Sequence, residues 1–173
     1  MSNRDIMKAI KANKQRRHSM TYQENYQKWV DFADLPDYLR QDLINMDEKT
    51  KEDAFYTNLE FGTAGMRGLI GAGTNRINIY VVRQATEGLA RLIESKGGNE
   101  KERGVAIAYD SRHFSPEFAF ESAAVLAKHG IKSYVFESLR PTPELSFAVR
   151  HLNCFAGIMV TASHNPAPFN GYK

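Results

Sequence analysis

Apolar residues near the start of the chain recur at helical spacing. A first helix is predicted by the apolar positions Tyr22, Tyr26, Trp29, Val30 and Ala33. Pro36 suits the first turn of a second helix. The apolar face of that second helix is formed by Leu39, Leu43 and Met46. With a third, short helix expected over Lys51–Thr57, residues 20–57 are predicted to form a helical preface.

The pattern changes at Leu59, where apolar pieces become short and glycine becomes frequent. The stretch EFGTAGMRGLIGAGTN holds five glycines in sixteen residues and predicts a strand, a tight loop and a strand. Asn78 then suits the N-cap of a helix that Gly97 and Gly98 end. The buried side of that helix is expected to carry Val82, Ala85, Leu89 and Leu92.

Short apolar runs alternate with helical patterns from Gly104 onward. The runs GVAIAY, IKSYVF and FAGIMV predict three strands. Ser115 and Thr142 each precede a Pro-Glu pair, so both are expected to cap a helix. The inward residues of these two helices are expected to be Ala119, Ala123 and Leu126, followed by Leu145, Val149 and Leu152. The chain is therefore predicted to be an α/β protein: a three-layer α/β/α sandwich with a mixed, mostly parallel sheet, preceded by N-terminal helices.

Polar residues directly follow two of the predicted strands. Asp110-Ser111-Arg112 comes after GVAIAY, and the stretch 161–166, TASHNP, comes after FAGIMV. In open α/β sheets, ligands bind beyond the carboxyl ends of the strands. Both segments are thus expected at the functional edge of the sheet.

Composition narrows the class of protein. Of the 173 residues, 42% are hydrophobic and 25% are charged, and no apolar run approaches the length of a membrane helix. Residues 1–19 hold six Lys or Arg and one Asp, so the net charge of +3 comes from a basic N-terminal extension that is expected to be disordered. No basic-aromatic pattern supports nucleic-acid binding. Cys154 alone allows no internal disulfide, which favours a cytoplasmic location and a buried structural thiol.

Ser163 is the most suggestive nucleophile. It lies on a loop between an apolar strand and an Asn-Pro turn, with His164 beside it. The loop is not the G-x-S-x-G elbow of serine hydrolases, and Ser, Asn, Pro and Gly also favour an ordinary surface turn. Two cations change this balance. Arg67 sits in the glycine-rich GTAGMRG, and Lys173 follows an expected Asn170-Gly171 turn, a set that suits a phosphate.

With these residues in place, the chain resembles the N-terminal domain of the α-D-phosphohexomutases, in the phosphoglucomutase branch. The strings that carry the resemblance are EFGTAGMRG, GAGTNR, AYDSR, RPTPELSFAVR and, most specifically, TASHNPAPFNGYK. It extends from about Met20 to Lys173, with residues 58–173 as the first α/β domain. Residues 1–19 lie before the usual start of this branch, as an extension or a misplaced start.

The resemblance implies roles for four residues. Ser163 would carry the phosphoryl group that passes to a sugar phosphate, giving glucose 1,6-bisphosphate as the intermediate between glucose 1-phosphate and glucose 6-phosphate. His164, Arg67 and Lys173 would bind phosphate or substrate and assist catalysis beside it. Mg²⁺ would be bound by an oxygen of phosphorylated Ser163 and by three aspartates of a D-G-D-x-D-R loop.

The chain departs from the family because it has no D-G-D-x-D-R string. The sugar-recognition and second phosphate-binding loops of the later domains are also absent, so the isolated chain is expected to be inactive and to need the remaining domains of a parent chain. Three alternatives stay open. These are a stand-alone sugar-phosphate-binding module, phosphopentomutase or phosphomannomutase specificity, and a serine hydrolase.

Overall fold

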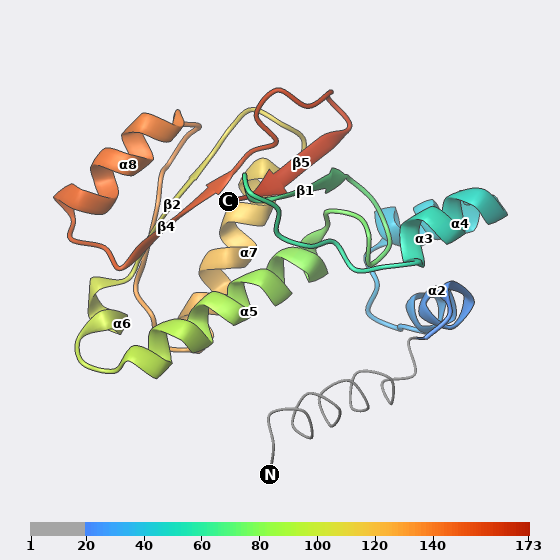
Figure 1. Cartoon of the computed structure of the whole chain (residues 1–173), viewed down its shortest axis with the longest axis horizontal. Coiled ribbons are helices and arrows are strands. Elements are labelled where there is room, and N and C mark those ends of the chain that lie inside the picture. Colours follow the sequence, from blue (N-terminus) through green and yellow to red (C-terminus); the bar gives the residue numbers. More distant parts are fainter. Residues whose placement is uncertain (1–19) are drawn as a thin grey trace, which may run out of the picture.

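The computed structural model describes residues 20–173, which form a helical segment and an α/β domain (Figure 1). The expected basic extension, residues 1–19, lies outside the described residues. The helices are α2 (Tyr22–Val30), α3 (Asp37–Asn45), α4 (Glu48–Phe55), α5 (Ile79–Lys96), α6 (Glu100–Arg103), α7 (Ser115–Lys128) and α8 (Thr142–His151). The strands are β1 (Met66–Leu69), β2 (Val105–Tyr109), β3 (Ser133–Val135), β4 (Ala156–Val160) and β5 (Phe169–Tyr172). Along the described chain, none of the helices combines the length and apolar character needed to cross a membrane.

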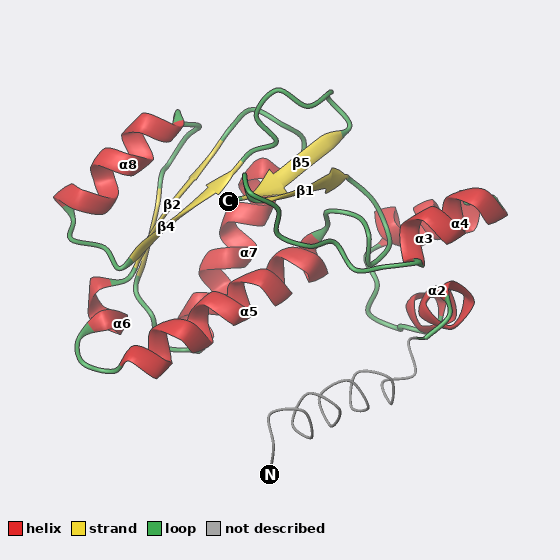
Figure 2. Cartoon of the chain, viewed as in Figure 1, coloured by secondary structure: helices red, strands yellow, loops and turns green. Residues whose placement is uncertain are grey.

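The five strands form one mixed sheet in the order β1-β5-β4-β2-β3. Strands β1, β5, β4 and β2 are labelled in Figure 2. Strands β2, β3 and β4 are parallel, whereas β5 is antiparallel to both β1 and β4. Helices α5 and α7 pack together on one face of the sheet, and α8 covers β2 and β4 on the other face (Figure 1). The predicted mixed α/β/α sandwich with N-terminal helices is therefore confirmed.

The helical preface, residues 20–57, contains three helices as predicted, although α4 begins three residues earlier than expected. Leu39 and Phe55 are completely buried in its own small core, which also includes Ala72 from the glycine-rich segment. Tyr26 and Trp29 pack edge-on against Phe55. Trp29 also packs edge-on against Tyr80 of α5, and this contact fixes the preface against the α/β domain.

The α/β domain has its main core between the sheet and the helices α5 and α7. The largest completely or almost completely buried side chains there are Ile77, Val82, Ile93, Val105, Ile107, Phe118, Leu126, Ile158 and Val160. Asn78 caps α5 as predicted: its side chain accepts a hydrogen bond from the backbone N–H of Val81. Gly97 ends the same helix with a positive φ of 67°.

Several local predictions were wrong. The glycine-rich segment contains one strand, β1, and two isolated bridges, one between Gly62 and Gly65 and one between Ile70 and Ile77. The expected Asn170-Gly171 turn is part of strand β5, because these residues pair with β1. Leu92 and Leu152 are 48% and 40% exposed. The core is instead contacted by Ile93, the next residue of α5, and by Ala148 of α8, one turn before Leu152.

The two predicted caps at Ser115 and Thr142 were also wrong. Each is the first residue of its helix, and neither helix has a side-chain cap. The residue before Ser115 is Phe114, in a left-handed conformation with φ 63°. Ser115 does not cap because its hydroxyl donates a hydrogen bond to Asp110, 2.8 Å away, and accepts one from Asn170.

Candidate active site

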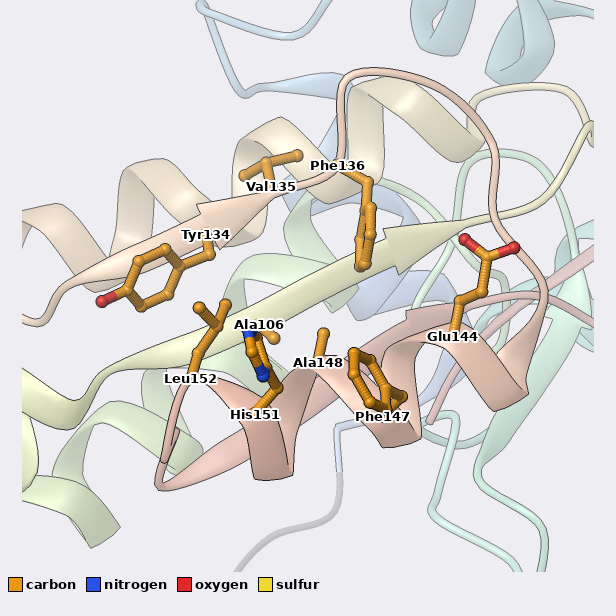
Figure 3. A pocket seen from close by; sticks show the side chains of 9 residues that line it. All are labelled: Ala106, Tyr134, Val135, Phe136, Glu144, Phe147, Ala148, His151 and Leu152. Carbon is orange, nitrogen blue, oxygen red and sulfur yellow. The ribbon is translucent and has the colours of Figure 1, made fainter.

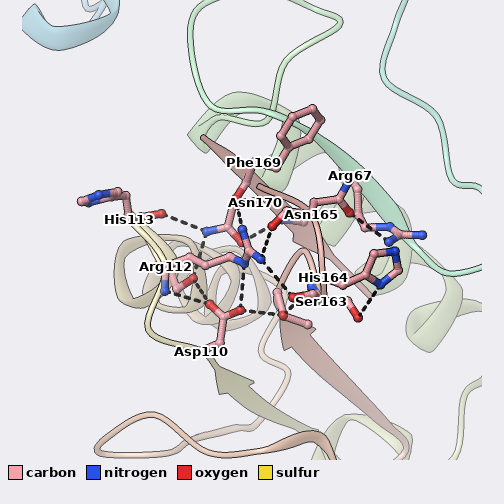
Figure 4. A network of polar contacts seen from close by, with 12 residues as sticks. Arg67, Asp110, Arg112, His113, Ser163, His164, Asn165, Phe169 and Asn170 are labelled. Atoms are coloured by element: carbon pink, nitrogen blue, oxygen red, sulfur yellow. Dashed lines mark hydrogen bonds and ion pairs between the residues drawn. The ribbon is translucent and has the colours of Figure 1, made fainter. Parts of the chain in front are cut away.

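The loop after β4 and the segment after β2 meet at one edge of the sheet. Tyr109 and Val160 are paired in register at the ends of these parallel strands. The backbone N–H of Asp110 donates a hydrogen bond to the carbonyl of Val160. The segments that follow β2 and β4 therefore leave the sheet side by side. Figure 4 shows the polar network that results, with Ser163 and His164 on one segment and Asp110 and Arg112 on the other. The two segments therefore converge at the carboxyl ends of the strands, as expected.

Ser163 has a left-handed backbone with φ 58° and an exposed side chain. Such a conformation costs a residue other than glycine of order 1–3 kcal/mol and persists only where the surroundings fix it. Here both backbone polar groups are held by side chains. The Ser163 N–H donates to Thr161 Oγ1 at 2.9 Å, and the Ser163 carbonyl accepts from Arg112 Nη2 at 3.0 Å. The hydroxyl is thereby left at the surface, open to a reactant.

His164 is the neighbour of the Ser163 hydroxyl. Its Nδ1 lies 3.5 Å from Ser163 Oγ, which is longer than an ordinary hydrogen bond. Within residues 20–173, no carboxylate contacts the His164 ring to orient it. In a serine hydrolase, the serine is hydrogen-bonded to a histidine base, and a third group, usually a carboxylate, orients that histidine. No such third group contacts His164 among residues 20–173.

Arg67 reaches the loop from β1. It pairs in register with Gly171 of β5, and its Nη1 donates to Asn165 Oδ1 at 3.0 Å. Its side chain is half-buried, and its other guanidinium N–H groups have no hydrogen-bond partner in the part of the chain that the structure describes. Arg67 is therefore fixed at one nitrogen and retains donors for an anion near Ser163.

Lys173 directly follows β5. Its backbone exchanges two hydrogen bonds with Met159 of β4, so its position is set by the sheet. Its aliphatic stem passes Gly65, where φ is 90° and a Cβ atom would lie 2.5 Å from Lys173 Cγ. A glycine is needed at that position to let the lysine pass. Among residues 20–173, its Nζ has no hydrogen bond or ion pair, and no contact joins it to Ser163.

Arg112 and Asp110 are central to the loop, although the sequence assigned them no role. The Arg112 guanidinium donates to four loop carbonyls: Pro166 and Phe169 at 2.9 Å, Ser163 at 3.0 Å and Asn165 at 2.7 Å. Its Nε lies 3.3 Å from Asp110 Oδ2, and that oxygen also accepts from Thr161 Oγ1 at 2.6 Å. The available signal was the AYDSR string at the end of a predicted strand.

A polar hollow of about 410 Å³ lies beside the loop. It is lined by Asp110, Ser111, Arg112, His113, Ser163 and Ala167. Figure 3 shows a second pocket of about 300 Å³ under α8, lined mainly by apolar and aromatic side chains such as Phe136 and Phe147. A sugar phosphate requires charged and hydrogen-bonding groups, so of these two pockets the hollow beside Ser163 suits it better.

The described residues do not fit a magnesium site. Over residues 20–173, no group of three His, Cys, Asp or Glu side chains is placed to bind a metal ion. Asp110, the carboxylate of the network, already accepts hydrogen bonds from Arg112, Ser115 and Thr161. Mg²⁺ usually takes six oxygen ligands, and this part of the chain offers at most an oxygen of a phosphate on Ser163.

Comparison with known proteins identifies the family. Residues 58–173 match the model of phosphoglucomutase/phosphomannomutase, alpha/beta/alpha domain I. The chain is 43% identical over 146 residues to a phosphoglucomutase of Staphylococcus epidermidis, covering 84% of the chain and 26% of the relative. It is 48% identical over 123 residues to a phosphoglucomutase of Staphylococcus aureus, covering 71% of the chain and 22% of the relative.

A solved structure from Thermus thermophilus, provisionally assigned as a phosphomannomutase, is also similar. It superposes with a TM-score of 0.60 at 36% identity, over 68% of this chain and 25% of that one. The chain thus spans about a quarter of the length of these relatives. Since the family model covers most of the chain, the protein belongs to the phosphoglucomutase/phosphomannomutase family, whose α/β/α domain I it contains in residues 58–173.

Proposed function

We propose that this chain provides the phosphoserine of a phosphoglucomutase, with Ser163 as the residue that carries the phosphoryl group. The observation that carries the proposal is the backbone of Ser163, which is held in a left-handed conformation while its hydroxyl stays exposed. Residues strained in this way cluster at functional sites. The position beyond the carboxyl end of β4, beside a polar hollow, supports the same assignment.

The proposed reaction exchanges one phosphorus–oxygen bond for another. The bond between Ser163 Oγ and phosphorus breaks as a hydroxyl oxygen of the sugar phosphate bonds to the phosphorus. The sugar hydroxyl gives up one proton and Ser163 Oγ takes up one, so the proton count is unchanged. Glucose 1,6-bisphosphate results. After it reorients, its other phosphate returns to Ser163 and leaves the isomeric monophosphate. Phosphoryl transfer depends mainly on positioning and on neutralising charge.

Three residues are proposed to assist Ser163. Arg67 retains free donors at the loop and would bind oxygens of the transferring phosphoryl group. His164 Nδ1, 3.5 Å from Ser163 Oγ, would supply a proton to that oxygen as the bond to phosphorus breaks. Lys173 would add positive charge from the end of β5. Mg²⁺ would receive only a phosphoserine oxygen from this chain, and its other ligands would have to come from outside residues 20–173.

Sugar choice and location are part of the proposal. Glucose phosphates are favoured because the two staphylococcal relatives carry the name phosphoglucomutase. The structural neighbour makes mannose phosphates the second choice. A reduced, buried Cys154 fits a cytoplasmic enzyme acting on a soluble sugar phosphate.

The test uses a protein in which residues 1–173 are followed by the downstream domains of the S. aureus relative. The joined protein with the wild-type loop should convert glucose 1-phosphate to glucose 6-phosphate in a coupled assay. Peptide mapping should locate phosphate on Ser163. Ser163→Ala should lower kcat by at least about 10³-fold, because the acceptor oxygen is lost. Ser95→Ala, at the distant end of α5, is the matched control. Turnover that survives Ser163→Ala would refute the assignment.

A binding module without catalysis is the second candidate, favoured by the missing metal ligands among residues 20–173. It predicts that the 173-residue chain binds glucose 6-phosphate and shifts the NMR signals of Arg67 and Ser163, while the joined protein shows no turnover. A hydrolase predicts labelling of Ser163 by a fluorophosphonate, which the unoriented His164 argues against.

A further inference from the structure

Arg112 has every donor of its guanidinium group engaged. An arginine side chain has five N–H donors. Four of them bond to the carbonyls of Ser163, Asn165, Pro166 and Phe169, and the fifth, on Nε, faces Asp110 (Figure 4). The group is 15% exposed. We infer that Arg112 is a positioning residue, which holds the loop after β4 so that Ser163 presents its hydroxyl for phosphoryl transfer.

The inference rests on the shape of the loop. Four carbonyl oxygens that point at one place repel one another unless donors lie between them. The planar guanidinium satisfies all four, whereas a lysine ammonium has only three donors on a single atom. Without the guanidinium, the loop would open and the left-handed Ser163 would relax to a conformation with negative φ, since nothing else among the described residues holds its carbonyl.

Asp110 joins the two halves of this arrangement. One of its oxygens, Oδ2, faces Arg112 and also accepts from Thr161 Oγ1, which in turn accepts the Ser163 N–H. The same carboxylate therefore supports the groups that hold Ser163 on both sides. The negative charge of the Asp110 carboxylate also offsets the positive charge of the Arg112 guanidinium.

Arg112 differs in this respect from Arg67. Arg67 uses one nitrogen on Asn165 and keeps donors for an anion, whereas Arg112 has none left and faces a carboxylate. A residue that binds substrate raises KM when it is replaced, while a residue that places the reacting oxygen lowers kcat. This inference depends on the proposed role of Ser163 only for its kinetic consequence.

The opposite end of the sheet offers a matched control. Arg103 donates to the carbonyls of Asn153 and Cys154 and pairs with Glu100, just before β4 begins. Asn153 is also left-handed, with φ 52°. Arg103→Lys therefore removes the same kind of carbonyl contact from the segment before β4, at the other end of this strand from Ser163.

The first test is structural and needs no activity. Cross-correlated relaxation and backbone chemical shifts in the 173-residue chain report the sign of φ at Ser163. Arg112→Lys should abolish the positive φ, while Arg103→Lys should keep it. Thr161→Val removes the acceptor of the Ser163 N–H at nearly constant side-chain volume. It should lower the population with positive φ at Ser163, and it replaces the first variant in the test if Arg112→Lys fails to fold. A positive φ retained in both loop variants would overturn the inference.

The second test is kinetic and uses the joined protein described above. Arg112→Lys should lower kcat on the order of 10- to 100-fold with KM changed less than about threefold, because displacement of a reacting atom by about 1 Å has effects of that size. Arg103→Lys should leave both constants near wild type. A rise in KM that accounts for the loss would make Arg112 a substrate ligand and overturn the inference. If the wild-type joined protein shows no turnover, the proposed function fails, and the φ of Ser163 alone decides the role of Arg112.

Discussion

The hydroxyl groups of Tyr172 and Thr86 lie 3.1 Å apart in the interior of the domain and share a hydrogen bond. Tyr172 is the last residue of β5 and is 4% exposed, and Thr86 lies in the middle of α5. The bond therefore attaches the strand that follows the Ser163 loop to the helix beneath the sheet. Burial raises the pKa of Tyr172 to about 12, although the hydrogen bond from Thr86 acts in the opposite direction.

Alkaline pH should destabilise the protein through Tyr172. Its pKa is raised in the folded state, so its contribution is fully present below the ordinary value of 10 and is lost as pH rises from about 10 to about 12. Two pKa units correspond to roughly 2–3 kcal/mol. Urea unfolding at a series of pH values should show this loss. In Tyr172→Phe it should be smaller, with a cost near neutral pH of about 1 kcal/mol for the missing hydrogen bond. An unchanged alkaline slope in the variant would contradict the assignment.

His129 should titrate above its ordinary range. Hydrogen bonds to Glu87, 2.8 Å from Nε2, and to Glu94, 3.2 Å from Nδ1, raise the pKa of His129. The same contacts, with Arg91 and Lys101, lower the pKa values of Glu87 and Glu94. Glu87→Gln should move the pKa of His129 down toward about 6.5, as followed by the imidazole NMR signals.

The cluster around His129 also has a defined pH window. The histidine contribution to stability is present below about pH 6.5 and is lost as pH rises through its raised folded pKa. The carboxylate contribution is present above about pH 4.5 and is lost as pH falls through the lowered pKa values. Glu117→Gln, on the exposed side of α7, is the control and should leave the His129 titration unchanged.

The predicted strands β2, β3 and β4 were found from sequence because short apolar runs between helices are a local signal. Strand β5 was missed since its Asn170-Gly171 pair favours a turn by itself. Its strand conformation comes from a non-local fit: a Cβ on Gly171 would lie 2.7 Å from Arg67 Cγ and 2.7 Å from the Thr161 carbonyl. Glycine at position 171 allows β1 and the segment after β4 to pack closely against β5, although these segments are far apart in the sequence.

In the candidate site, too, some features could be predicted from the sequence and others could not. Ser163 and Arg67 could be proposed from sequence because hydroxyl and cation chemistry belongs to the residue types themselves. The bonds of Arg112 could not, since they join it to carbonyls more than fifty positions away, and carbonyls leave no mark on the sequence. The register of β2 and β4 creates those contacts.

Two glycine substitutions should have opposite effects on stability. Gly73 has φ 131°, and a Cβ there would lie 2.5 Å from the Ala54 carbonyl oxygen, in the contact between the helical preface and the domain. Gly73→Ala should cost about 2–4 kcal/mol from the backbone strain and the clash. Gly88 lies in α5, where an added Cβ would have no atom within 4 Å beyond the adjoining residues and the helix backbone, so Gly88→Ala should stabilise the fold by about 0.5–1 kcal/mol. Urea midpoints measure both changes, and a neutral Gly73→Ala would contradict the close contact.

Cys154 should react slowly with thiol reagents in the folded protein. It is 4% exposed, and burial raises the pKa of its thiol against the opposing charges of Arg103 and Lys132. Because the thiolate is the reactive form, modification by a disulfide reagent should be at least about 100-fold slower than in urea-unfolded chain. Arg103 also donates to the Cys154 carbonyl, so Arg103→Lys should loosen this segment and speed the reaction. A native rate equal to the unfolded rate would show that the segment before β4 is open in solution.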